Sequence, residues 1–587
     1  MSVKTLQKVV FFILLPLALV IRLFLVQYNG WEWDIDGFAN IAQGIVHGGL
    51  LNIDVRAGDS FYPPIFIYIL KIIGHIYQYL SNGEFIKQGY WFLLAFKLPA
   101  ILTDLGIGIV LYLIGKNYYT PKKSLAIVGV FLFSLPIIYT SSVFGENDSI
   151  PIFFLALSFY FLNRKNVIPA GVFITLGILT KIQTVIFLPL IVAYLIKING
   201  LAKLKNFLIG AFLTFIITYL PFYINGGMYL TFTYPFFKSI DLYPQTSMNA
   251  YNIWWIFTNS FWSDKSNLLS MSNIGDFKTI IGTLSYKLIG LSLFIIAYLG
   301  TFIRLIKNKI IKFQIYEFSL LGFFISLSFF SLPTQMHERY ILPIFLFLPF
   351  LFVKNNYWKI ITIILNITVF LNLYIPLNIV YQDSHLTIKN LFYNTIGINN
   401  IFYITILISI VISIITVMTY YSIIKKHFKT NLIIILIIIL LTFISSIIIF
   451  FKKSVYLSTV PTLNNIAELT RIKPNNNNYI FSGNLPFNNG LLISNNSAPT
   501  FQTYNFNFLE GLVGISDEAT DCQTGTTFYV ISDDNIIFES KTLSKYQQPE
   551  YFKIPILDYT NFTLATNNIT SSGCTPAAWL DIKLLNK

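Results

Sequence analysis

Long apolar runs separated by short polar connections are the dominant pattern of this chain. Several runs reach the roughly 20 residues that cross a bilayer, and the run 431–451 carries no charged side chain. The first run, 9–27, contains Arg22 and lacks a small-residue cleavage pattern, so we expect an uncleaved first helix. Further spans are expected near 90–114, 124–142, 149–162, 167–180, 184–196, 207–224, 286–303, 314–332, 340–353, 359–380, 401–424 and 430–451. The pattern predicts an all-α polytopic membrane protein with about 13 transmembrane helices.

The pattern changes after residue 453. Residues 454–587 are rich in Asn, Ser and Thr, and short strand-like runs alternate there with turns marked by Pro or Gly. We therefore expect two domains, a transmembrane domain over 1–453 and a small β-rich domain over 454–587. The two cysteines of the chain, Cys522 and Cys574, both fall in the second domain. In an oxidising compartment they are expected to form a disulfide.

Composition and charge agree with a membrane protein. The chain is 55% hydrophobic and 11% charged, whereas a soluble domain has about 25% charged residues. The net charge of +14 lies in short Lys- and Arg-rich connections between the spans, which indicates membrane orientation and not nucleic-acid binding. This charge pattern places the C-terminal domain outside the cytoplasm. It also predicts two large external loops, over 28–89 and 225–285.

One apolar segment, 62–80, is long enough to span the membrane. If it did, every later Lys- and Arg-rich connection would lie outside the cytoplasm, against the charge pattern. It begins with two prolines and contains Lys71 and His75, so we expect it to lie along the outer surface of the membrane.

The polar residues near the outer ends of the predicted spans are candidates for chemistry, because charges inside or beside a membrane are costly. Lys97 and Asp104 lie seven residues apart on one predicted helix, and Asp104 alone falls away from the outer end. The other candidates are Asp34, Asp36, Asn147, Asp148, Lys181, Gln183, His337, Glu338 and Arg339. Their shared side predicts an extracytoplasmic polar site.

Each candidate also has a structural interpretation. The acidic pair of the first loop could be solvated, and Lys97 with Asp104 could form an ion pair across two helical turns. The turn 145–149 is typical of a helix N-cap formed by Asn147 or Asp148. Arg339 could extend to lipid head groups from an interfacial cap.

Taken in order, these motifs resemble a known family. The first loop contains Asp34-Ile-Asp36-Gly-Phe38 and then Tyr62-Pro-Pro, and further motifs occupy 97–105, 145–149, 179–189, 248–257 and 336–343. The set resembles the GT-C superfamily glycosyltransferases that use polyprenyl-phosphate sugars. It is most similar to the prokaryotic relatives of GPI mannosyltransferase II and to the dolichyl-phosphate-glucose glucosyltransferases of N-glycan assembly. One departure is Glu146, where relatives usually carry Gln.

The resemblance implies transfer of a hexose, mannose or glucose, from a polyprenyl-phosphate donor to a lipid-linked or envelope glycan acceptor, with inversion. The resemblance implies that Asp34 is the general base and Asp36 a supporting residue. Chemistry alone does not decide which of the two carboxylates is the base. Arg339, His337 and Lys181 would face the donor phosphate. Tyr62, Lys97, Asp104, Asn147, Asp148, Gln183 and Glu338 would complete the substrate site. No cofactor is expected, and a divalent metal is not favoured.

The expected partners are the donor, the acceptor and membrane lipid. The membrane would be the plasma membrane of a prokaryote or the endoplasmic reticulum membrane of a eukaryote.

Two other functions stay open. A protein O-glycosyltransferase or oligosaccharyltransferase-like enzyme of the same fold would hold a divalent metal beside the acidic pair of the first loop, so a chelator would abolish its activity. A lipid or saccharide transporter would use Lys97 and Asp104 as pathway residues and would move substrate without transferring sugar.

Overall fold

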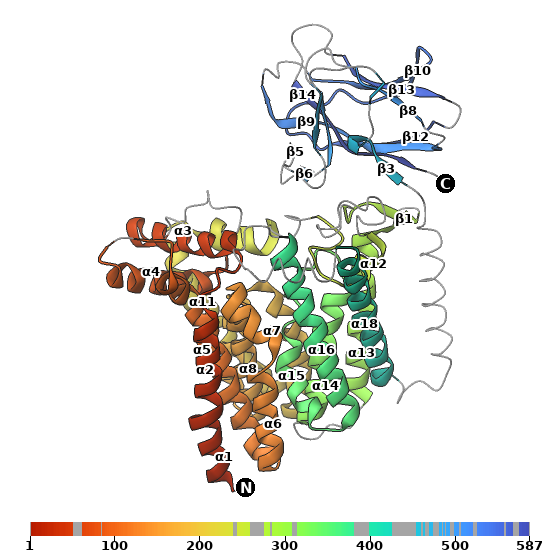
Figure 1. The fold of residues 1–587 in the computed structure, drawn as a ribbon. Helices are drawn as coiled ribbons and strands as arrows, with labels where there is room; N and C mark the ends of the chain where they lie inside the picture. Colours follow the sequence, from red (N-terminus) through yellow and green to blue (C-terminus); the bar gives the residue numbers. More distant parts are fainter. Residues whose placement is uncertain are drawn as a thin grey trace. The chain divides into compact units, whose positions relative to one another are not determined.

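A computed structural model gives the fold of the chain (Figure 1). It describes residues 2–50, 62–83, 85–238, 244–258, 275–281, 284–307, 314–380 and 398–424, and most of 454–585. The undescribed residues within 454–585 are 460–461, 464–468, 473–479, 484, 488, 494–497, 504–505, 521–524, 557–558, 568–570 and 571–574. The chain divides into two compact units, Met1–Ile256 with Ile274–Ile433, and Phe257–Asn273 with Ile434–Lys587.

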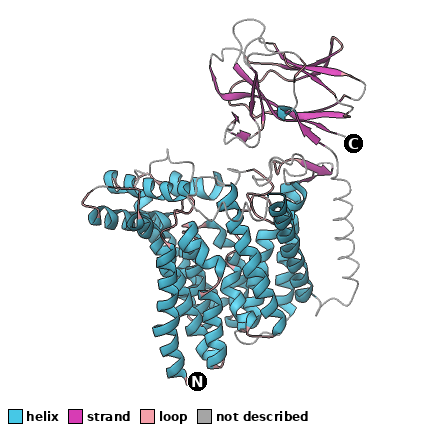
Figure 2. Cartoon of the chain, in the orientation of Figure 1, coloured by secondary structure: helices cyan, strands magenta, loops and turns pink. Residues whose placement is uncertain are grey.

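The first unit is almost entirely helical (Figure 2). Its elements up to the second large loop are α1 (Val3–Val9), η1 (Val10–Leu14), α2 (Leu15–Leu25), α3 (Glu32–Gly48), α4 (Pro64–Leu80), α5 (Tyr90–Tyr118), α6 (Pro121–Leu132), α7 (Leu135–Ile138), η2 (Tyr139–Phe144), α8 (Ser149–Asn163), α9 (Val167–Ile178), η3 (Ile182–Phe187), α10 (Leu188–Asn199) and α11 (Leu201–Ile224). The remaining elements are η4 (Tyr229–Lys238), α12 (Ile253–Thr258), β1 (Thr279–Ile281), β2 (Leu284–Ser285), α13 (Tyr286–Lys307), α14 (Ile315–Ser331), α15 (Ile344–Phe352), α16 (Asn356–Ile375), η7 (Pro376–Val380) and α18 (Ile398–Ile424).

The number of membrane spans differs from the prediction. Among the described residues, six helices are long and apolar enough to cross a membrane, and a seventh span results if the bent pair Pro121–Leu132 and Leu135–Phe144 counts as one. Helices such as α8, with 15 residues, reach only about 22 Å at 1.5 Å per residue. The prediction of about 13 spans is therefore not confirmed. The expected span 430–451 lies outside the described residues.

The segment 28–89, expected as a large external loop, contains two helices, α3 and α4, and α4 covers the apolar segment 62–80. Figure 1 shows α3 and α4 lying across the helices of the bundle. The two helices pack closely at Gly74, where a Cβ atom would come within 2.9 Å of Val46 Cγ2 and 3.0 Å of the Ala42 carbonyl oxygen. Asp34 and Asp36 thus lie on helix α3, and positions two apart on a helix point about 200° away from each other.

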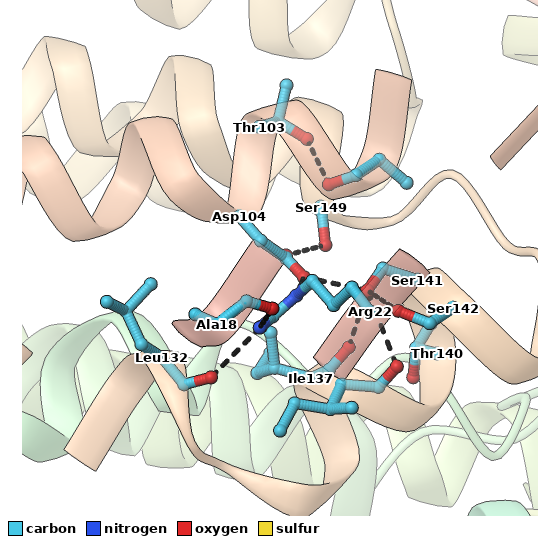
Figure 3. Close-up of polar contacts among 12 residues, drawn as sticks. Ala18, Arg22, Thr103, Asp104, Leu132, Ile137, Thr140, Ser141, Ser142 and Ser149 are labelled. Atoms are coloured by element: carbon cyan, nitrogen blue, oxygen red, sulfur yellow. Dashed lines mark hydrogen bonds and ion pairs between the residues drawn. The ribbon is translucent and has the colours of Figure 1, made fainter. Parts of the chain in front are cut away.

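A buried ion pair ties five parts of the bundle together, α2, α5, α6, η2 and α8 (Figure 3). Arg22 Nε on α2 donates to Asp104 Oδ2 on α5 at 2.9 Å, and neither side chain is exposed. The same carboxylate accepts hydrogen bonds from Ser141 Oγ in η2 and Ser149 Oγ at the start of α8. Arg22 also donates to the carbonyl oxygens of Ala18 and Leu132. Because burying such charges is costly, their complete pairing fixes the positions of these helices.

The second unit contains two packed antiparallel sheets, and the prediction of a β-rich C-terminal domain is confirmed. The larger sheet has the order β12-β9-β14-β7-β4, with β3 also paired to β14, and the smaller has the order β11-β10-β13-β8. Rings from both sheets meet in the core, where the centroids of Phe528 and Trp579 lie 5.4 Å apart. The strands are β3 (Ser454–Tyr456), β4 (Leu469–Ile472), β5 (Ile480–Ser482), β6 (Leu485–Phe487), β7 (Gly490–Ile493), β8 (Thr500–Gln502), β9 (Phe508–Thr520), β10 (Phe528–Ser532), β11 (Asn535–Glu539), β12 (Glu550–Pro555), β13 (Asn561–Thr566) and β14 (Thr575–Leu585). Cys522 and Cys574, and with them the expected disulfide, lie outside the described residues.

Candidate active site

Arg339, in the connection between α14 and α15, lies at the centre of a cluster of charged side chains. Its Nη1 donates to Glu338 Oε1 at 2.8 Å, and its Nη2 lies 3.1 Å from Glu146 Oε1. Asp34 Oδ2 on α3 lies 3.9 Å from Nη2, and Asp148 Oδ2 lies 3.6 Å from Nε. The structure thus brings together residues that are hundreds of positions apart in the sequence.

Lys181 adds a second cation to this group, which we call the Arg339 cluster: Asp34, Glu146, Asp148, Lys181, Glu338 and Arg339. Lys181 lies between α9 and η3, and its Nζ donates to Asp148 Oδ1 at 2.7 Å. Asp148 therefore bridges Lys181 and Arg339. These six residues contribute four carboxyl groups, from Asp34, Glu146, Asp148 and Glu338, and two basic groups, from Lys181 and Arg339. The acidic groups of the cluster therefore outnumber its basic groups.

The turn 145–148 is held by its own backbone. Gly145 has a φ of +87°, which glycine adopts without strain, and the N–H groups of Gly145 and Glu146 both donate to the Thr140 carbonyl oxygen. A Cβ atom on Gly145 would come within 2.7 Å of Ile35 Cδ1 on α3. The turn that carries Glu146 and Asp148 is therefore packed directly against the helix that carries Asp34.

The connection that carries Arg339 is held by the second large loop. The Met248 N–H donates to the Met336 carbonyl oxygen at 2.9 Å, so the motif 248–257 lies beside the motif 336–343. Buried Asp276 accepts hydrogen bonds from Thr334 Oγ1 and Gln335 Nε2. Two motifs that are far apart in the sequence therefore lie side by side in the fold.

Burial and neighbouring charges shift the protonation of these groups. Burial raises the pKa of Glu146 to about 8 despite the opposing effect of Arg339, and Asp34 adds to the rise. Burial likewise raises the pKa of Glu338. Burial opposes the charge of Lys181, but Asp148 and Glu146 outweigh it and raise the lysine pKa.

Burial lowers the pKa of His337 well below its usual value, and Arg339 and Lys181 lower it further. His337 is therefore neutral near pH 7. It can offer a hydrogen bond to a substrate but not the positive charge that the sequence suggested.

A small cavity of about 30 Å³ opens beside the cluster. Its polar wall is formed by Asp148, Lys181, Gln183, Arg339 and Tyr340. Most of the rest of its lining is apolar and comes from Pro151, Ile152, Leu155, Phe187, Phe329 and Pro343, among others. The cavity thus joins charged groups to an apolar surface.

Several residues predicted for the site lie elsewhere. Lys97 and Asp104 are not paired with each other, because seven residues on a helix are about 10 Å apart. The Lys97 ammonium group donates instead to the carbonyl oxygens of Val26, Tyr28, Ser142 and Val143, and Asp104 pairs with Arg22. Both side chains are fully buried and hold the backbone around the turn 145–148.

Three further residues predicted for the site are Tyr62, Asp36 and Asn147. Tyr62 packs against Phe38, and the centroids of the two rings lie 5.7 Å apart. Phe38 lies one helical turn after Asp34 on α3. Asp36 is exposed on the other side of α3. Asn147 is buried in the turn, and its carbonyl oxygen accepts the Ile150 N–H.

The sequence placed Glu146 with Asn147 and Asp148 in one polar turn but gave it no role in the site, and it did not indicate Tyr340 or Arg22 as site or supporting residues. Glu146 stood in a recognised motif, but nothing local indicated its contact with Arg339. Arg22 could have been found, because a cation within an apolar run requires a buried partner. Among the described residues, no group of three or more His, Cys, Asp or Glu side chains is arranged to hold a metal ion.

Two family models match this chain. Residues 61–316 match Glycosyltransferase family 87, and residues 453–585 match the NPCBM/NEW2 domain. The first match includes Asp148 and Lys181 but not the segments of Asp34 and Arg339. No curated protein matches the chain. The prediction of a GT-C glycosyltransferase is supported at this level, whereas the closer relatives expected from the sequence are not confirmed.

The chain also has similarities among solved structures. CBM51 from Clostridium perfringens GH95, in complex with methyl-galactose, is 18% identical with a TM-score of 0.20, and the match covers 22% of this chain and 99% of that one. The tandem CBM51 modules of Sp3GH98 from Streptococcus pneumoniae SP3-BS71 are also 18% identical with a TM-score of 0.20, over 23% of this chain and 47% of that one.

Proposed function

We propose that this membrane glycosyltransferase transfers a hexose from a polyprenyl-phosphate carrier to a hydroxyl group of a lipid-linked or envelope glycan, with inversion, on the extracytoplasmic face. One observation carries the proposal. Carboxylates and cations from four separate segments meet beside a cavity that is lined mostly by apolar side chains. Such a site suits a substrate that is charged at one end and a hydrocarbon at the other.

Asp34 is the general base in this proposal. Its side chain is 25% exposed, against 2% for Glu146, 9% for Asp148 and 0% for Glu338. It is therefore the carboxylate of the cluster that an acceptor hydroxyl can best reach. A base must lie within hydrogen-bond reach of the proton that it removes as the hydroxyl attacks the anomeric carbon.

Arg339 and Lys181 stabilise the leaving phosphate. The phosphodiester becomes a phosphate monoester as the glycosidic bond breaks, and the negative charge that develops is stabilised by cationic donors. The two side chains line the same cavity, and Asp148 contacts both. The cavity now has room for about two water molecules, so binding of a phosphate requires these ion pairs to rearrange.

The apolar wall of the cavity fits the start of an isoprenoid chain. A polyprenyl tail must stay in lipid while its sugar reaches a polar site, and an arrangement of helices with an apolar cavity wall meets both needs. The second domain, with its carbohydrate-binding fold, would retain the acceptor glycan near the enzyme.

The test is transfer by the purified protein. Polyprenyl-phosphate mannose and polyprenyl-phosphate glucose are incubated with the enzyme and a glycolipid acceptor, and donor hydrolysis and product are followed by mass spectrometry. Asp34→Asn should lower transfer by roughly 10²- to 10⁴-fold because the base is lost. Asp36→Asn, the same change on the other side of α3, is the matched control and should lose much less.

Lack of transfer from every donor, or normal turnover by Asp34→Asn, would reject the proposal. Activity that depends on a divalent metal and transfers sugar to protein would favour the O-glycosyltransferase alternative.

A further inference from the structure

Glu146 is a buried acid that faces the same nitrogen of Arg339 as Asp34 does. Its side chain is only 2% exposed, and Oε1 lies 3.1 Å from Arg339 Nη2. Asp34 Oδ2 lies 3.9 Å from the same nitrogen. Two carboxyl groups that face one guanidinium nitrogen repel each other when both are ionised, and they can share a hydrogen bond when one of them carries a proton.

The surroundings decide which group holds that proton. The charged and titratable side chains around Glu146 are Asp34 on α3, Lys97 on α5, Asp148 in the same turn, Lys181 before η3, and His337, Glu338, Arg339 and Tyr340 between α14 and α15. Lys97 is committed to four carbonyl oxygens. Arg339 is shared among four carboxyl groups, so it does not fully compensate any one of them.

Burial separates Glu146 from Asp34. Glu146 is almost inaccessible to water, which favours its neutral form, whereas Asp34 keeps a quarter of its side chain exposed. The pKa of Glu146 is accordingly raised to about 8. The backbone of Glu146 is fixed by the hydrogen bond from its N–H to the Thr140 carbonyl oxygen, in a turn that packs against α3 at Gly145.

We propose that Glu146 is a positioning residue that acts in its protonated form, donating a hydrogen bond to the Asp34 carboxylate and directing the other oxygen of that carboxylate toward the acceptor. This inference rests on the proposed role of Asp34 as the base. An ionised Glu146 would repel Asp34 and compete with it for Arg339. Asp34 would then turn away from the acceptor, and transfer would slow.

The experiment compares the pH profiles of wild type, Glu146→Gln and Glu146→Ala with polyprenyl-phosphate mannose or glucose as donor. In wild type, transfer should fall about tenfold per pH unit above about pH 8, where Glu146 ionises. Glu146→Gln keeps a neutral hydrogen-bond donor of the same shape, so it should retain transfer and lose this alkaline fall. Glu146→Ala removes the donor and should lose roughly 10²-fold or more at every pH.

A second readout does not depend on the donor. The infrared carbonyl band of a protonated carboxyl group should disappear between about pH 6 and about pH 10 in wild type, and that change should be absent in Glu146→Gln. The inference would be overturned if transfer by Glu146→Gln still fell above about pH 8, or if the infrared change between about pH 6 and about pH 10 were the same in Glu146→Gln as in wild type. Either result would overturn it even if Asp34→Asn is inactive. Absence of transfer in wild type would instead reject the proposed function, and the infrared result would still decide whether Glu146 is protonated.

Discussion

Replacing Asp104 with asparagine tests whether the buried ion pair with Arg22 holds the helices around the site. The amide keeps the shape of the carboxylate, and its one oxygen can still accept from one of the two serines, Ser141 and Ser149, which donate to different oxygens of Asp104. It removes the negative charge opposite Arg22, whose side chain has no exposure. Arginine cannot lose its proton in a protein, so the variant leaves an uncompensated charge in the bundle.

The expected cost follows from these contacts. Removing one partner of a buried ion pair typically costs about 3–5 kcal/mol. The double variant Arg22→Met, Asp104→Leu removes both charges, so most of that loss should be recovered. A residual loss of about 1 kcal/mol is expected because Ser149 loses its acceptor, whereas Ser141 still donates to the Ile137 carbonyl oxygen.

The assay is denaturant-induced unfolding of the purified protein in detergent, followed by tryptophan fluorescence. Asp36→Asn is the matched control, since it makes the same chemical change at an exposed position and should leave the free energy of unfolding within about 0.5 kcal/mol of wild type. A double variant as unstable as Asp104→Asn, or a single variant as stable as the control, would refute the reasoning.

Three further predictions concern the same region. Lys97→Met should lower the stability by several kcal/mol in the same unfolding assay, because four buried carbonyl oxygens lose their donor; unchanged unfolding would contradict it. Gly145→Ala should cost about 1–3 kcal/mol and reduce transfer, because φ is +87° and Ile35 Cδ1 would lie 2.7 Å from the new Cβ. Arg339→Lys should lower transfer about 10²- to 10³-fold in the donor assay while the protein stays monodisperse, since the planar fork is lost; normal turnover by Arg339→Ala would exclude the residue from the site.

The apolar runs allowed the helices to be predicted well, because an apolar run needs no distant information. The runs did not show how long each helix would be, or whether it would be long enough to cross the bilayer. The predicted span 167–180 became α9, whose 12 residues cover about 18 Å, less than the roughly 30 Å of a bilayer core. Whether a short helix crosses the membrane depends on how its neighbours surround it, and the sequence does not carry that information locally.

The candidate site was predictable in part. The placement of Asp34, Asp148, Lys181 and Arg339 at one end of their segments predicted that they would converge, and the structure brings them together. The sequence could not show that Arg339 is surrounded by carboxyl groups, because the contact with Glu146 joins positions almost 200 residues apart.

The partners of Lys97 and Asp104 could not be predicted from the sequence either. The two residues share one helix and carry opposite charges, so the sequence suggested a local pair. On a helix, however, side chains interact across three or four residues and not across seven. Their actual partners come from α2, η2 and α8, which only the tertiary fold brings near.

The four hydrogen bonds of Lys97 also limit how the enzyme can change shape during turnover. They join the segment before α3, through Val26 and Tyr28, to the end of η2, through Ser142 and Val143. The helix of Asp34 and the turn of Glu146 are thus fastened by one ammonium group, and we expect them to move as a rigid body. Arg339 belongs to a different body, anchored through Asp276 and Met336. We expect the gap through which a substrate enters to open along the boundary between the two bodies, with Asp34 and Glu146 on one side and Glu338 and Arg339 on the other.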